Sequence, residues 1–499
     1  MAQEQYSRLS LEDKEDNAAL LAGQTLEIYP PPTASSSKPV YSQASHRRNV
    51  TGWIIISTAA EIFAVVSLAL FIPVCLEQTS ADNPGSVHSV SFALYVTSIS
   101  VLLQFLVVIS LGTIADDPRI RRRLLLCMTT LGSISAVCIP LLSFAPTQLL
   151  PATVILPSII ASVTYGVAAV CINAYLPGLA RESSEVLRIS EELSRDIRSA
   201  GVSGEGGDED DLTETNTHES LPMSDPSIRR AASLEAYDAA VSSSTSHLSS
   251  IGVAFGFLGG VCVLLLVIGP VYAMQGSTIS LKLVIAFSGI CWGLISVPAA
   301  FLLPAQVESE LKRTPPPART FRDWLGDVVI AWRLLGDMLT IKEIRRLPSL
   351  FALLGAWFML SDGTSSHHTP RTLPSHQCLT SLIAFTTIIS TAILFAKVEL
   401  GMSATALILI GVLTPLFGCI GAVAWPRAQK AYGWTSLQTL ILLIFLASSV
   451  PAYGCLGFLP FFAESGFGGL TSPGEMYALA IIFGESFHGA ILRRGLTAF

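Results

Sequence analysis

The stretch Gly112 to Leu124 reads GTIADDPRIRRRL and lies between two long apolar runs. At the foot of the second run it carries four arginines within five positions: Arg119, Arg121, Arg122 and Arg123. Such a cluster is costly to move across a lipid bilayer, so it marks the cytosolic end of a membrane segment. The stretch therefore predicts a membrane protein whose chain turns back on the cytosolic side at this point.

The composition favours a membrane protein over a soluble one. Of the 499 residues, 51% are hydrophobic and only 13% are charged, whereas soluble domains average about 25% charged residues. The formal net charge of −7 argues against nucleic acid as a partner, because nucleic-acid binding requires a basic face. Most of the chain is therefore expected to contact membrane lipid rather than water.

Apolar runs recur at the length that crosses a hydrocarbon core of about 30 Å. They predict an all-α polytopic membrane protein, with helices near 52–76, 91–115, 124–145, 151–177, 251–274, 280–303, an interrupted helix from 348, then 403–424, 436–460 and the start of another near 476.

The connections between these runs alternate in charge. Residues 77–90 and 146–150 contain no lysine or arginine. Nearly all the basic residues of the connections lie instead in 116–123, 181–248, 304–347 and 425–435. The positive-inside rule then places the N-terminus and the even-numbered loops in the cytosol.

The polar segments complete the predicted organisation. Residues 1–48 and 181–248 are polar and Ser-rich, so we expect a disordered cytosolic tail and a disordered cytosolic loop. Within the cytosolic loop 304–347, apolar residues of 321–347 recur at three- and four-residue steps, which is typical of a helix lying in the membrane interface. The membrane parts are then 49–180 with helices 1–4, 249–303 with helices 5–6, and 348–499.

The N-terminal tail contains a short sorting-type motif. Asp16 to Leu21 reads DNAALL and resembles an acidic dileucine signal. Such signals are addresses read by adaptor complexes, so Asp16, Leu20 and Leu21 predict these complexes as partners. A match this short also occurs by chance.

The opening stretch has a weaker echo later in the chain. Gly421 to Gly433 reads GAVAWPRAQKAYG and follows the eighth predicted helix, as GTIADDPRIRRRL follows the second. Repeated halves with a site between them are how many transporters are built. We therefore predict a pair of cytosolic gate loops with these residues: Gly112, Asp116, Arg121, Arg122, Arg123 and Arg427.

Polar residues inside apolar runs are the candidates for a substrate or proton pathway: Glu61, Glu77, Gln104, Asn173 and Asp362. A charge at a helix centre costs about 2.5–3.5 kcal/mol on insertion scales. For Gln104 and Asn173, helix–helix hydrogen bonding is the favoured interpretation. Glu61 lies about 13 Å into the first helix at 1.5 Å per residue. A lone carboxyl at that depth is suited to carrying a proton, and Glu77 lies near the opposite mouth of the same helix.

The sequence shows no enzyme motif. It lacks Gly-x-Ser-x-Gly, the phosphate-binding Gly-x-x-x-x-Gly-Lys-Ser/Thr and His-Glu-x-x-His. Its nine cysteines include no CxxC pair and no Cys/His cluster with metal-ligand spacing. We therefore predict a protein that is not an enzyme and needs no cofactor or metal, and any pumping must be driven by a gradient.

Several motifs together resemble the autophagy-related protein 22 family: EIF at Glu61, FIPVCLEQ at 71–78, NAYLP at 173–177, SIGVAFG at 250–256, LSDG at 360–363 and TAILFAK at 391–397. The resemblance covers roughly residues 50–485. It implies a major facilitator-type bundle of two six-helix halves in the fungal vacuolar membrane. It further implies export of neutral amino acids such as leucine after autophagic breakdown.

The chain departs from the family pattern at two places. Residues 364–386, with His367, His368 and His376, interrupt the seventh helix, and we hypothesise a retained intron or a gene-model error rather than a metal site. After Gly489 the family pattern stops, so we expect a truncated second half. The rival interpretations are another major facilitator porter, for a monocarboxylate or drug, and a non-transporting membrane factor in the breakdown of autophagic bodies.

Overall fold

The computed structural model describes residues 43–82, 89–142, 150–202, 226–303, 321–338, 340, 392–434, 438, 442, 445, 446, 449, 453 and 472–484. The regular elements among these residues are all helices, which confirms the all-α prediction for the described chain. Two compact units are distinguished: Met1–Gln43 with Arg181–Val241, and Ala44–Ala180 with Ser242–Phe499.

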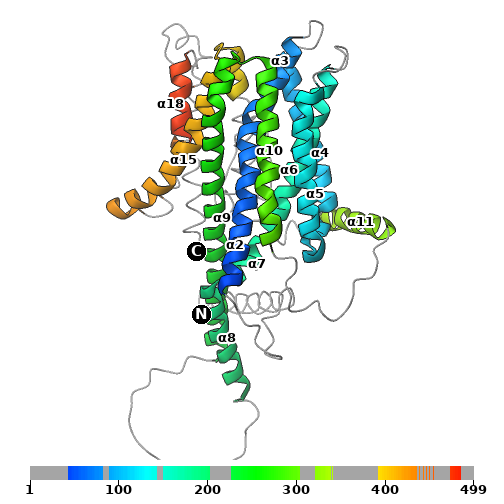
Figure 1. Cartoon of the computed structure of the whole chain (residues 1–499). Helices are drawn as coiled ribbons and strands as arrows, with labels where there is room; N and C mark the ends of the chain where they lie inside the picture. The colour runs from blue at the N-terminus through cyan, green and yellow to red at the C-terminus, as the bar shows by residue number, and fades with distance from the viewer. Residues whose placement is uncertain are drawn as a thin grey trace, which may run out of the picture. The chain divides into compact units, whose positions relative to one another are not determined.

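The larger unit is a bundle of long helices that run side by side (Figure 1). Its first half consists of α2 (Gln43–Phe63), η1 (Ala64–Phe71), α3 (Ile72–Ala81), α4 (Ser89–Asp116), α5 (Pro118–Leu141), α6 (Leu150–Ala174), α7 (Leu176–Arg181), the part of α9 (Pro226–Ala273) from Ser242 onward, and α10 (Thr278–Leu302). Its second half contributes a helix at 392–398, α15 (Ala404–Tyr432) and α18 (Pro473–Phe483). In the sequence between the two halves, α11 (Phe321–Met338) lies at the outer edge of the bundle beside α4, at a steep angle to the long helices (Figure 1).

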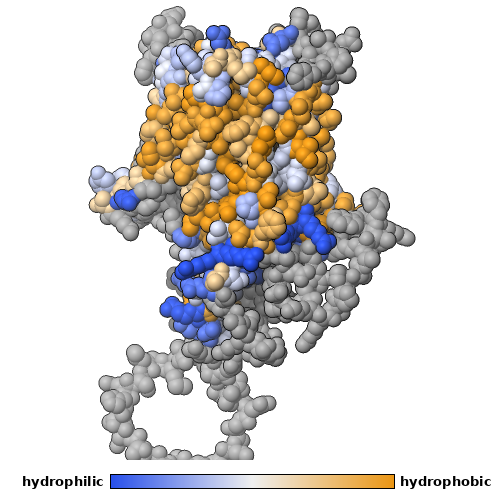
Figure 2. All heavy atoms as spheres, viewed as in Figure 1, coloured by the Kyte–Doolittle hydropathy of each residue, from blue (hydrophilic) through white to orange (hydrophobic). Residues whose placement is uncertain are grey.

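Seven helices of the described residues are long and apolar enough to cross a membrane. The lipid-facing surface is clearest on α4, where Tyr95, Leu102 and Phe105 are more than half exposed. Large apolar side chains on an outer face suit a hydrocarbon solvent, because they need no partner there. Figure 2 shows the corresponding hydrophobic band across the bundle, with hydrophilic residues at its two ends.

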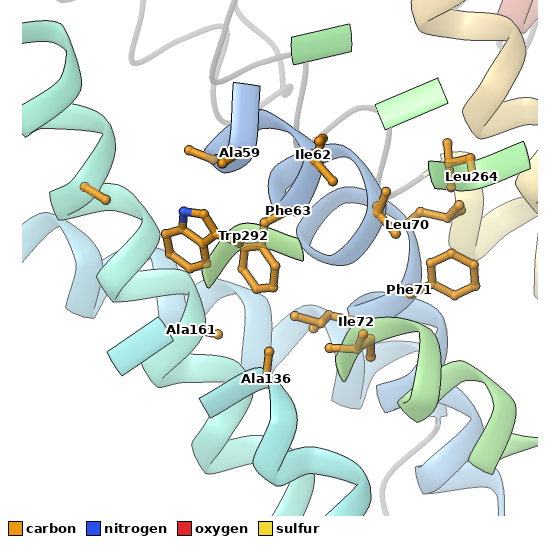
Figure 3. Close-up of a cluster of buried hydrophobic side chains, with 14 of the residues drawn as sticks. Ala59, Ile62, Phe63, Leu70, Phe71, Ile72, Ala136, Ala161, Leu264 and Trp292 are labelled. Carbon is orange, nitrogen blue, oxygen red and sulfur yellow. The ribbon is translucent and has the colours of Figure 1, made fainter. Parts of the chain in front are cut away.

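The core of the first half is built around Trp292 of α10. Trp292 is fully buried, and its ring stacks on Phe63 with a centroid distance of 4.7 Å (Figure 3). Small residues on the facing helices, Ala136 and Ala161, admit the two large rings. Membrane helices usually pack closely through small residues. The hydrophobic effect does not drive helices together in lipid, so their association depends on van der Waals contact.

The first membrane helix is longer and less regular than expected. The prediction of 52–76 becomes one continuous helical stretch from Gln43 to Ala81, of which Ala64–Phe71 is a π-helix. The predicted disordered tail is wrong at its end, because residues 43–48 already form the first turns of α2. Their polar side chains, including Arg47 and Arg48, allow the helix to extend beyond the hydrocarbon core.

The expected loop at 112–124 is almost entirely helical. Only Asp117 separates α4 from α5, and the backbone N–H of Arg121 donates to Asp117 O at 3.0 Å. The echo is helical too, since α15 continues to Tyr432 and ends at Gly433 with φ of 66°. Glycine suits that left-handed conformation because it has no Cβ.

The prediction that 181–248 is disordered is wrong for the described parts of that segment. Residues Ser184–Val202 form α8, and α9 begins at Pro226. In α8 the buried Val186 and Leu193 share one face, an amphipathic pattern hidden by the serines and charges around it. Residues 203–225 lie outside the described chain.

Candidate functional site

Glu61 lies near the middle of the first membrane helix. It follows Gln43 by 18 residues and precedes Ala81 by 20, and it comes three residues before the π-helix. Its side chain is partly buried against α9, where a Cβ built on Gly256 would lie 2.5 Å from Glu61 Cβ. Glycine at 256 is therefore what lets α9 approach the carboxyl-bearing face of α2.

Glu61 forms no hydrogen bond or ion pair with any described residue. Its electrostatic neighbour is the phenol of Tyr165 on α6, which in turn meets the Trp292 ring edge-on at 6.3 Å. The indole N–H of Trp292 is buried without a hydrogen-bond partner among the described residues. A carboxyl in this setting is chemically able to take up and release a proton, or to accept a donor from a passing solute.

The π-helix beside Glu61 makes one polar contact across the bundle. Ser67 in η1 shares a hydrogen bond with Ser288 of α10, and both side chains are fully buried. π-Helical turns are rare and occur frequently at functional sites. The irregular segment thus lies directly between Glu61 and the far end of the helix that carries Glu77.

Gln104 and Asn173 do not join Glu61. Gln104 packs on Gly166 of α6 and accepts a hydrogen bond from Ser162 Oγ at 3.4 Å, which is the helix–helix role favoured for it. Asn173 is exposed at the last turn of α6.

The arginines of the opening stretch bind within the first half. Arg121 Nε donates to Ala115 O at 2.8 Å, and its guanidinium lies 5.2 Å from the ring centroid of Tyr175. Arg122 donates to Ala300 O at the end of α10. Arg123 is exposed, and an added Cβ at Gly112 would meet no described atom within 4 Å.

At the opposite end of the bundle, polar groups of both halves meet. Lys397 Nζ, from the helix at 392–398, donates to Gln78 Oε1 of α3 at 3.2 Å, and Gln78 Nε2 donates to Gly276 O at 3.4 Å. Glu77 is only 7% exposed, and its Oε2 is buried without a hydrogen-bond partner among the described residues. Glu77 was predicted from the sequence, whereas Lys397 and Gln78 were not. The signal available for Lys397 was a lysine at the end of an apolar run.

The remaining predicted residues lie outside this description. Asp362, the three histidines near it and Asp16, Leu20 and Leu21 fall outside the described residues. The side chain of Asp116 is likewise not described, and Arg427 is exposed on α15. In the described part of the chain, no group of three or more His, Cys, Asp or Glu side chains is placed to hold a metal ion.

Comparison with known proteins agrees with the motifs. A family model described as "Vacuole effluxer Atg22 like" matches residues 45–380 and 377–491. Autophagy-related protein 22 of Cryptococcus neoformans var. neoformans serotype D is 32% identical over 501 residues, covering 88% of this chain and 81% of that protein. Autophagy-related protein 22-1 of Penicillium rubens is 28% identical over 517 residues, covering 92% and 82%.

A solved structure also aligns with the chain. The xylose transporter XylE from E. coli, in a partially occluded inward-open conformation, has a TM-score of 0.47 and 12% identity, covering 90% of this chain and 85% of that chain. The two segments matched by the family model meet at 377–380, inside the predicted interruption of the seventh helix. Because these segments together span most of the chain, the protein belongs to the family of Atg22-like vacuole effluxers and is a multi-pass membrane transporter.

Proposed function

We propose that the chain exports neutral amino acids, such as leucine, from the vacuole lumen to the cytosol, with Glu61 coupling export to proton movement. The description of the family as vacuole effluxers supports the compartment and the direction. The observation that carries the coupling is the Glu61 carboxyl, which is mid-helix, partly buried and without a described partner. Because such a group is costly to keep in a membrane, its presence there favours a working role.

Transport would proceed by alternating access. Rocking of two helical halves around a site near the membrane midplane is the mechanism that two-half transporters use. Glu61 lies near the middle of the first helical stretch, next to the close contact between α2 and α9, which supports a place for it near such a site. Protonation would remove its charge, so the two protonation states would differ in how readily the halves close around the site.

The discriminating experiment is amino-acid efflux from isolated vacuoles, comparing wild type with Glu61→Gln. The amide keeps the size of the side chain but carries no titratable proton. Glu235→Gln is the matched control, since it makes the same change at an exposed carboxylate on α9. Loss of leucine efflux in Glu61→Gln alone supports the proposal, whereas wild-type efflux rates in that variant would remove Glu61 from the mechanism.

The same assay separates the rival functions. Efflux of monocarboxylates or drugs in place of amino acids would identify another kind of porter. Amino-acid efflux that does not depend on the chain, together with slow breakdown of autophagic bodies, would identify a non-transporting membrane factor.

The direction of transport also requires a defined topology, which we propose to have the N-terminus in the cytosol. The sequon Asn49-Val50-Thr51 lies in α2 close to Arg47 and Arg48. On the cytosolic side it stays unmodified. A mobility shift of the full chain on treatment with an N-glycosidase would contradict this topology.

A further inference from the structure

We propose that the end of the bundle opposite the arginines forms a subsite for the zwitterion of a free amino acid. Lys397 binds the α-carboxylate, and Glu77 binds the α-ammonium group. This inference rests on the proposed function, because it names how that substrate is first recognised on the luminal side.

The Lys397 ammonium is held by a weak partner. Its bond of 3.2 Å goes to the neutral amide oxygen of Gln78, and both side chains are only partly buried. An ammonium group has three donors, and a carboxylate adds to the hydrogen bond a charge attraction that the neutral amide oxygen of Gln78 does not supply. A substrate carboxylate therefore competes well for the position that Gln78 Oε1 occupies.

Glu77 offers the complementary charge. Its side chain is 7% exposed, and Oε2 is buried with no hydrogen-bond donor among the described residues. Buried acceptors are nearly always paired, so an unpaired one marks a place where a donor from outside the described chain fits. An α-ammonium group supplies both the donors and the positive charge.

The two groups share one region but are not paired with each other. Lys397 contacts Gln78, the residue that directly follows Glu77 in α3. Neither side chain takes part in an ion pair with a described residue. A direct Glu77–Lys397 pair would leave no room for a ligand, whereas separate opposite charges match a molecule that carries both on one carbon atom.

The contact also joins the two halves. Lys397 belongs to the second half and Gln78 to the first, and Gly276, which accepts from Gln78, lies in the turn between α9 and α10. A Cβ built on Gly276 would lie 2.8 Å from Ala404 Cβ at the start of α15. When a substrate carboxylate displaces the Gln78 side chain from the Lys397 ammonium group, a contact between the halves is lost and a contact with the substrate forms.

The test is competition against radiolabelled leucine bound to the purified full chain in phosphatidylcholine liposomes. The competitors are leucine, leucinol, which lacks the carboxylate, and 4-methylpentanoate, which lacks the ammonium group. The variants are Lys397→Met and Glu77→Gln. Lys397→Arg is the conservative rescue, and Glu235→Gln, which removes an exposed carboxylate from the first part of α9, is the charge-matched control.

Lys397→Met is expected to weaken the binding of leucine and of 4-methylpentanoate about tenfold, as loss of one charge-assisted bond predicts. The binding of leucinol, which has no carboxylate, should stay unchanged. Glu77→Gln is expected to weaken the binding of leucine and of leucinol by a similar factor. The binding of 4-methylpentanoate, which has no ammonium group, should stay unchanged. Lys397→Arg and Glu235→Gln should bind leucine like wild type. In efflux the two test variants should raise KM more than they lower kcat.

Three results overturn the subsite. The first is equal weakening of all three competitors, which a purely structural role produces. The second is unchanged binding in both test variants, and the third is no leucine binding by wild type. Failure of the proposed function gives a different result. If the variants show the expected binding pattern but the wild-type chain exports no leucine, the subsite is retained and transport is refuted.

Discussion

Replacing Gly256 by alanine tests the contact that positions Glu61. A Cβ at residue 256 would lie 2.5 Å from Glu61 Cβ and 2.7 Å from its Cγ. The Glu61 Cβ is attached to the backbone of α2, so no change of rotamer relieves the overlap with it. Since carbon atoms pack best at about 3.5–4.0 Å, α2 and α9 must separate locally by about 1 Å.

The expected cost follows from two opposing effects. Overpacking of this kind destabilises by about 1–3 kcal/mol, while replacing glycine by alanine inside a helix gains about 1 kcal/mol. Gly112→Ala in α4 is the matched control for stability, because its added Cβ meets no described atom within 4 Å. The free energy of unfolding of Gly256→Ala should therefore fall about 1–3 kcal/mol below that of Gly112→Ala.

The assay is thermal denaturation of the full chain in detergent, followed by size-exclusion chromatography. Leucine efflux of Gly256→Ala is measured beside wild type, and it should be slower because the Glu61 side chain is displaced. If Gly256→Ala is as stable as Gly112→Ala and exports leucine normally, the close α2–α9 contact and its role in placing Glu61 are both refuted.

Three further contacts give sharp expectations. Ser67→Ala and Ser288→Ala should be non-additive, with a coupling energy of about 0.6 kcal/mol in a double-mutant cycle, because each removes the same interhelical bond; additive losses would deny the bond. Trp332→Phe removes the Nε1 bond of 3.0 Å to Ser110 and should speed hydrogen exchange across α11 as much as Ser110→Ala does, while unchanged exchange would show that the bond does not anchor α11. Arg121→Lys loses the planar group over Tyr175 and should lower the free energy of unfolding by about 0.5–1 kcal/mol. Arg123→Lys, at an exposed position, should leave the midpoint of thermal denaturation unchanged.

The membrane helices could be predicted because bilayer thickness leaves few alternatives. Runs expected at 91–115 and 280–303 appear as Ser89–Asp116 and Thr278–Leu302. An apolar run of that length has to be helical, since a backbone in hydrocarbon must satisfy its own hydrogen bonds. Glu61 could be selected as a candidate for the same reason, because a carboxyl is conspicuous in an apolar run.

The contacts around the candidate site were less predictable because they join distant parts of the chain. Lys397 and Gln78 are 319 positions apart, and Ser67 and Ser288 are 221 apart. The π-helix at Ala64–Phe71 is apolar except for Ser67 and contains no glycine or proline, so no residue in it signals the wider turn. Its geometry depends on packing against α10, which one sequence does not display.

Arg122 of the opening stretch makes an interhelical contact that the charge pattern alone does not predict. Arg122 of α5 and Arg48 of α2 donate to consecutive carbonyls, Ala300 O and Phe301 O, in the last turn of α10. Carbonyls in that turn lack partners within their own helix and carry the negative end of its dipole, so guanidinium groups bind them well. Both bonds join helices of the first half. The two guanidinium groups therefore tie α2 and α5 to the same turn of α10 at this end of the bundle.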